Sequence, residues 1–213
     1  MKHPFLLLIL IISVSCKQQM SESDRKVALE DFKSQEVRRV NKSEIFVAGF
    51  ERGKEISTIV QNVLNSRLTS TINEHGAVAA IAYCNVNVYP IVDSLSKALG
   101  ADIKRTSMQF RNPEDAPDQL EAELLDAYQY SIEVGTSVSD NIQEYDSVTL
   151  IYTKPIVAGQ MCLACHGTEV ETSVKNRIAE IYPNDKALNH KLNDLRGMWS
   201  IKLSVKEIVN SLE

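Results

Sequence analysis

The chain lacks the composition of several protein classes. Its 213 residues include 23 Lys and Arg against 28 Asp and Glu, a formal net charge of −5, so there is no basic excess to neutralise nucleic-acid phosphates. Four cysteines are too few for a disulfide scaffold of this length. Internal repeats are absent, and no transmembrane helix is expected after the first 15 residues. The remaining composition, 44% apolar and 24% charged, is that of a globular domain, alone or with an appendage.

The start of the chain has the pattern of an export signal. A short basic start precedes an apolar run over residues 5–12, and small residues follow directly before Cys16. The run is about half of the roughly 20 residues that span a bilayer, so residues 1–15 are predicted to be a signal peptide. A cysteine directly after small residues resembles a bacterial lipobox. Cys16 is therefore expected to carry a lipid, with plain secretion as the alternative.

The next segment, residues 16–42, is polar and rich in charge. We expect it to be a lipidated tether and linker that leads into one domain over residues 43–213. The predicted location is the periplasmic side of a bacterial membrane, with the choice between inner and outer membrane left open.

Apolar residues at helical spacing dominate the first part of the domain. They predict one helix over residues 43–75, ended by Gly76, and a second over 77–99, ended by Gly100. The first helix could support a homodimer or pack on its own domain. Possible bends or breaks within the two helices are Gly49, Gly53 and Pro90.

The pattern changes after residue 100. Alternating and β-branched residues predict strands over 102–109, 146–156 and 198–205. Further helices are predicted over 118–132 and 174–181, with a short one after Ser204, and a turn-rich loop over 111–117. Helices followed by strands that are interrupted by helices predict an α+β fold.

The strongest motif is Cys162-Leu163-Ala164-Cys165-His166, the C-x-x-C-H signature of c-type haem attachment. Two thiols at this spacing can bind the two vinyl groups of one porphyrin, and the histidine then lies beneath the iron as an axial ligand. A thioredoxin-like redox pair needs no following histidine, and a zinc site needs further ligands nearby. We therefore expect one covalent haem, held by Cys162, Cys165 and His166, and one-electron chemistry.

The residues by themselves leave the second axial ligand open. Methionine and histidine are the usual partners of a haem histidine. The candidates are His75, His190, Met108, Met161 and Met198. Met161 is too near the motif to reach the opposite face of the porphyrin, Met198 fits a core position, and both histidines fit a solvated surface. Cys84, taken alone, fits a buried small hydrophobe.

Four motifs in order make the chain similar to the PAS-like c-type haem family of exported bacterial domains. They are AIAYC at 80–84, RNP at 111–113 with Pro117, the haem motif, and YPND at 182–185 leading to DLRG at 194–197. The resemblance spans about residues 44–205. It implies a PAS-like antiparallel sheet with N-terminal helices packed around one covalently attached haem. It also implies that the iron is bound by His166 and Cys84.

Such ligation implies a function. A thiolate donates strongly to iron and favours its ferric state, so a low reduction potential is expected. Loss or exchange of the thiolate on reduction would suit a sensor of redox state or of a gas, acting on a separate partner protein. The alternative is a single-haem, membrane-tethered electron carrier whose acidic surface docks on a positively charged partner. No acid–base constellation is evident, so no enzymatic activity is expected.

Arginine forks match carboxylates. Arg111, together with Arg105 and Arg196, is therefore expected to bind the haem propionates. The alternative is that Arg111 only stabilises its loop. The YPND segment is expected to be a structural turn that closes the preceding helix.

Overall fold

The structure is a computed structural model that describes residues 21–34 and 39–212. The chain divides into two compact units, Met1–Arg39 and Val40–Glu213. The predicted signal peptide and Cys16 lie outside the described residues. In the first unit, α1 (Glu22–Ser34) is a helix, which the sequence analysis did not anticipate within the polar linker.

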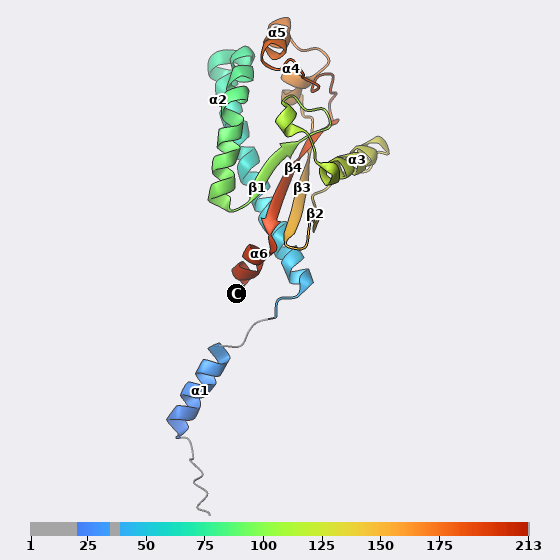
Figure 1. The fold of residues 1–213 in the computed structure, drawn as a ribbon. Helices are drawn as coiled ribbons and strands as arrows, with labels where there is room; N and C mark the ends of the chain where they lie inside the picture. The colour runs from blue at the N-terminus through green and yellow to red at the C-terminus, as the bar shows by residue number, and fades with distance from the viewer. Residues whose placement is uncertain (1–20, 35–38, 213) are drawn as a thin grey trace, which may run out of the picture. The chain divides into compact units, whose positions relative to one another are not determined.

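The second unit begins with α2 (Lys42–Leu99), which consists of two helical segments joined at Gly76. Its start is fixed by a capping box, in which Asn41 accepts a hydrogen bond from the Glu44 N–H and the Glu44 carboxylate accepts one from the Asn41 N–H. Gly76 has φ 80° and ψ 170°, and Gly100 ends the helix in the left-handed conformation. The sequence predicts both segments and their ends, and the structure shows that they form a hairpin (Figure 1).

Three residues that could interrupt these segments do not. Pro90 lies inside the second segment. It has no N–H to donate to the Val86 carbonyl, but Pro90 and Val86 are both exposed, so water can donate that hydrogen bond instead. Gly49 and Gly53 are buried and helical. They let the first segment approach the sheet closely, since a Cβ on Gly53 would overlap the ring of Tyr152.

Among the described residues, α2 is the one helix long and apolar enough, by length and composition, to cross a membrane. The break at Gly76 divides it, and apolar side chains of both segments pack against the sheet. Both segments thus use apolar side chains for packing within the domain.

The sheet is antiparallel, with strand order β1-β4-β3-β2. Its strands are β1 (Asp102–Thr106), β2 (Asn141–Glu144), β3 (Thr149–Val157) and β4 (Leu195–Ser204). The other helices are α3 (Gln119–Glu133), α4 (Leu163–His166), α5 (Thr172–Ile181) and α6 (Val205–Leu212), with short 3-10 turns at Pro113–Asp115 and Gln160–Cys162. The predicted α+β class is confirmed. The sequence analysis missed β2, which is only four residues long and mostly polar, and extended β1 by three residues.

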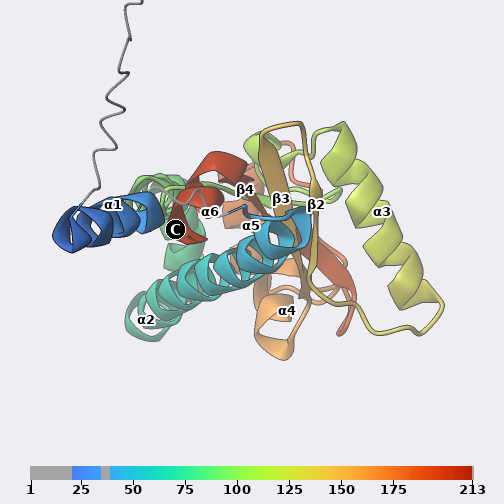
Figure 2. The same ribbon diagram turned by 90° about the horizontal axis from the view of Figure 1, so that it is seen from below.

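The hairpin covers one face of the sheet and α3 covers the other (Figures 1 and 2). Trp199, Ile201 and Leu203 of β4 point to the hairpin and form the main core. On the opposite face, Leu125 and Tyr128 of α3 pack against Met198. Alternate residues of β4 therefore serve two cores, because successive side chains of a strand point to opposite faces.

Asp118 is the N-cap of α3, and it ties the helix to the sheet. One carboxylate oxygen accepts from the Glu121 N–H at 2.8 Å, and the other accepts from Lys202 Nζ and from the Tyr145 hydroxyl, each at 3.2 Å. Burial acts to raise the pKa of Asp118, but the hydrogen bonds from Glu121 and Lys202 outweigh it and hold the pKa below its usual value.

The lowered pKa makes the stabilisation by Asp118 dependent on pH. It is present above the unfolded-state pKa of about 4 and is lost as the pH falls through the folded-state pKa. We expect D118A to lower the free energy of unfolding by about 1 kcal/mol at pH 6 and by less at pH 3, measured by urea denaturation. D118N keeps a capping oxygen and is the control. A loss in D118A that is as large at pH 3 as at pH 6 would contradict this role of the charge.

Candidate functional site

Side chains of the α2 hairpin, of β1 and β4, and of the segment that holds the C-x-x-C-H motif line an open cavity. The empty space among them, open solvent included, is about 1100 Å³. Its apolar wall comes largely from α2, through Leu68, Ile72, Ile81 and Val88. Its polar groups come from segments far apart in the sequence.

Every cysteine of the second unit lines this cavity. Cys162 and Cys165 of the C-x-x-C-H motif face it, and Cys84 reaches it from the second segment of α2. All three are free thiols. The structure thus brings Cys84 to the motif, although the residues alone favoured a buried small hydrophobe at this position.

His166 also lines the cavity, and its orientation is determined by a backbone group. Its Nδ1 lies 2.8 Å from the Ala187 carbonyl oxygen. Because a carbonyl can only accept, Nδ1 carries the proton and Nε2 keeps its lone pair. Burial, followed by the nearby charges of Arg196 and Arg111, lowers the pKa of His166 well below its usual value. The ring is therefore neutral and prepared to bind a metal through Nε2.

Two opposing effects act on the pKa of the Cys84 thiol. Burial raises its pKa, and the neighbouring Cys165 adds to that increase, whereas the charges of Arg105 and Arg111 lower it. The thiol is therefore protonated at neutral pH while the cavity holds no cation. A metal at this thiol would have to displace the proton, and the two arginines would favour the resulting thiolate.

The loop after α5 holds the motif in place. The His190 N–H donates to the His166 carbonyl at 2.9 Å, and the Asn189 N–H donates to the Gly167 carbonyl at 3.1 Å. Together with the bond from His166 to Ala187, these contacts fix both the backbone and the ring of His166. The sequence analysis had no signal for them, because a backbone carbonyl or amide can belong to any residue type.

The other candidate ligands have different surroundings. His190 is only 4% exposed and its Nε2 has no partner among the described residues, so the expected solvated surface is wrong for this residue. Its ring lies 6.3 Å from that of His166, edge to face. His75 and Met108 are exposed, and Met198 belongs to the core as predicted. Met161 is half-exposed and lines the cavity beside the motif.

Three arginines face the cavity: Arg105, Arg111 and Arg196. Arg111 forms an ion pair with Asp185 at 3.1 Å and donates to the Cys165 carbonyl at 2.7 Å. Asp185 belongs to the YPND segment, which does form a turn, since the Asp185 N–H donates to the Tyr182 carbonyl. The segment is more than a turn, however, because it anchors Arg111 and its Tyr182 lines the cavity. Burial raises the pKa of Tyr182 to about 12.

The donor set of this cavity is distinctive. It combines three thiols, one neutral imidazole and three guanidinium groups. Within residues 21–34 and 39–212, no three His, Cys, Asp or Glu side chains converge to hold a metal ion.

Fold and cavity together define an α+β domain with a helical hairpin, an antiparallel sheet and one large thiol- and imidazole-lined cavity. The chain belongs to the Tll0287-like family, whose model, described as Tll0287-like: Tll0287, matches residues 16–204. The four motifs behind the family resemblance all lie within this match. Among solved structures, the cyanobacterial heme-protein Tll0287 is similar at 24% identity with a TM-score of 0.49, over 71% of this chain and 95% of that one. No curated protein matches the chain.

Proposed function

We propose that this chain binds one c-type haem in the cavity, with Cys162 and Cys165 forming the thioethers. The observation that carries this proposal is the convergence of Cys84 and the C-x-x-C-H motif on one cavity. The donor set fits a haem. Thiols can bind its vinyl groups, an imidazole with a free Nε2 can bind its iron, and arginines can bind its propionates.

His166 and Cys84 are the proposed axial ligands. His166 is held by Ala187 in the tautomer that a ligand requires. Cys84 has Arg105 and Arg111 nearby to favour a thiolate. When bound, the haem would supply a one-electron couple and, at the iron, a site where a ligand can be exchanged.

The role we propose is a sensor of redox state or of a gas. Cys84 belongs to α2, whereas His166 belongs to α4. A change at one ligand would therefore act on the hairpin and a change at the other on the segment after β3. We further propose that the protein is exported and attached to a membrane by a lipid on Cys16, on the basis of the signal-like pattern before that residue.

The test is to produce the chain in bacteria that attach c-type haem, and to stain a denaturing gel for haem. The wild-type band is expected to stain, because thioethers survive denaturation, and the C162S/C165S double variant is expected to lose the stain completely. C84S removes a thiol from the same cavity and should keep it. An unstained wild-type band from cells that attach haem to other proteins would contradict the proposal.

The sensing role has its own measurement. Addition of carbon monoxide to the reduced protein should shift its main absorption band if a ligand is exchanged at the iron. A reduced spectrum that carbon monoxide leaves unchanged, with rapid and reversible electron exchange, would favour the electron carrier.

A further inference from the structure

The three arginines of the cavity differ in their partners. Arg111 is buried and fully engaged, because Asp185 neutralises its charge and the Cys165 carbonyl accepts a further hydrogen bond. Asp185 itself is almost completely buried. This pair therefore holds the backbone of the C-x-x-C-H motif in place. The charge of Arg111 is already neutralised, so it contributes little to binding a ligand.

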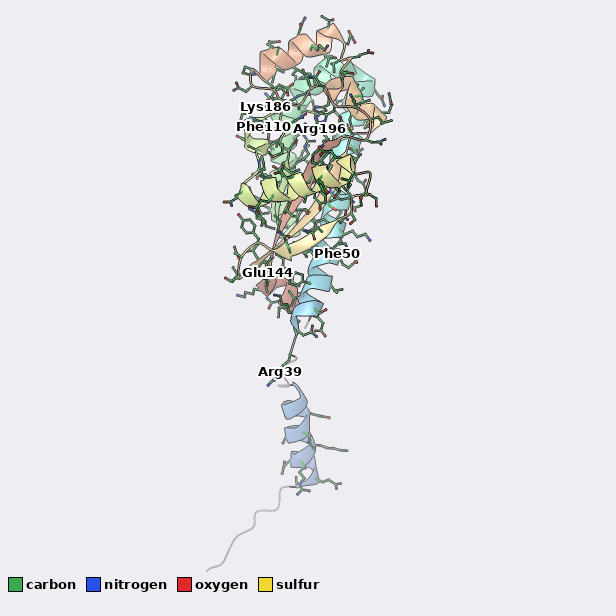
Figure 3. The ribbon with its side chains drawn as sticks, turned by 90° about the vertical axis from the view of Figure 1, so that its right-hand side faces the viewer. Arg39, Phe50, Phe110, Glu144, Lys186 and Arg196 are labelled. Atoms are coloured by element: carbon green, nitrogen blue, oxygen red, sulfur yellow. The ribbon has the colours of Figure 1, made fainter. Side chains whose placement is uncertain are left out.

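Arg196, by contrast, has no carboxylate partner among the described residues. It lies near the start of β4, at the same end of the domain as Phe110 and Lys186 (Figure 3). It is buried, and it donates only to neutral groups, the Ser107 hydroxyl and the Gln109 carbonyl, each at 3.2 Å. The charge of Arg196 is thus buried without an ion pair within the described residues.

Arg105 has even fewer contacts. It lies on β1 opposite Trp199 and is half-buried. Its side chain makes no hydrogen bond and no ion pair over the described parts of the chain. Because Arg105 lines the cavity, its guanidinium donors are available to a ligand there.

Two carboxylates lie near these charges, Asp115 and Asp185. Asp115 accepts a hydrogen bond from the Tyr89 hydroxyl at 2.7 Å, and Asp185 is paired with Arg111. Both carboxylates act to raise the pKa of Arg196, but burial and the charges of Arg105 and Arg111 outweigh them and lower it to about 9. Three guanidinium groups face two carboxylates here, so one positive charge is left in excess. Proteins rarely bury a charge unless it is paired, so this end of the cavity is built to receive negative charge from an occupant.

We propose that Arg196 and Arg105 are the carboxylate-binding residues of the cavity, which hold the propionates of the haem, and that Arg111 is a positioning residue for the motif. This assignment rests on the proposed haem binding and deepens it. It makes the cavity specific for a porphyrin with free acid groups, and it separates the three arginines that the sequence analysis treated as equivalent.

The test uses the cofactor-free full chain with reduced thiols, titrated with ferric protoporphyrin IX and with its dimethyl ester. The ester removes both carboxylates and leaves the ring, the vinyls and the iron unchanged. Binding is followed by quenching of the single tryptophan, Trp199, whose indole N–H donates to Gln61 in the cavity wall. Wild type should bind the acid about 10- to 100-fold more tightly than the ester.

Variants then assign the preference to particular residues. R196M and R105M should each reduce the ratio of acid to ester affinity about tenfold. R111M should weaken both ligands alike and keep the ratio, because Arg111 acts through the motif. R177M, at an arginine of α5 paired with Glu180, should change neither affinity.

The outcomes separate this inference from the function on which it rests. If wild type binds acid and ester equally, or if R196M and R105M keep the wild-type ratio, the assignment is wrong while haem binding stands. If wild type binds neither compound, both fail. Should R196M not fold, R105M decides the matter, because the described residues offer the Arg105 side chain no hydrogen bond or ion pair that the fold would lose.

Discussion

Replacement of Cys84 by serine is expected to change the absorption spectrum of the ferric holoprotein while the haem stays covalently attached. Serine has nearly the same size as cysteine, but its hydroxyl does not ionise near neutral pH and is a poor ligand for iron. The thiolate stabilises the ferric state more than the ferrous state. Loss of the thiolate should therefore raise the midpoint potential. A tenfold preference of the thiolate for ferric over ferrous iron corresponds to about 60 mV in a one-electron couple, and we expect a rise of at least about that size.

The control for this variant is V86S. Val86 lies on the same helix two residues further on, is 65% exposed and does not line the cavity. V86S should leave both spectrum and potential unchanged. A ferric spectrum of C84S identical to that of wild type would exclude Cys84 as an iron ligand.

The second large effect is expected at Gly53. A Cβ at this position would overlap Tyr152 Cγ and lie 2.7 Å from its Cδ2. Tyr152 is fully buried in β3 and its hydroxyl bonds to Asp140, so the ring cannot move aside. Alanine in place of a helical glycine contributes about 1 kcal/mol through helix propensity. Overpacking costs about 1–3 kcal/mol.

At Gly53 the cost of the steric clash should exceed the gain in helix propensity. We expect G53A to lower the free energy of unfolding by about 2 kcal/mol, and G53V, with two further methyl groups, to prevent folding of the second unit. Urea denaturation followed by Trp199 fluorescence measures both variants. Gly159 is the matched control, because a Cβ there meets no atom within 4 Å and its φ is negative. A G53A protein as stable as G159A would show that the helix and sheet can separate at little cost.

Contiguous residues predicted much of the fold. Gly76 and Gly100 ended the two helical segments as expected, since a helix end depends on the conformation of one residue. Asp118 began α3 for a similar reason, because its cap is made within one turn. The failures at Pro90, Gly49 and Gly53 have a common cause. Whether a helix tolerates proline or glycine depends on what faces that position, which is solvent for Pro90 and the sheet for the two glycines.

The candidate site likewise has some features that the local sequence predicts and others that only the tertiary structure determines. The spacing of Cys162, Cys165 and His166 is local, so the sequence by itself identified the motif and predicted its chemistry. That Cys84 shares a cavity with this motif, that Asp185 occupies Arg111, and that Arg196 is left without a carboxylate were decided only by the tertiary structure. These are contacts between segments far apart in the chain, and no spacing along the sequence specifies which side chains a fold brings together or which buried charge it leaves unpaired.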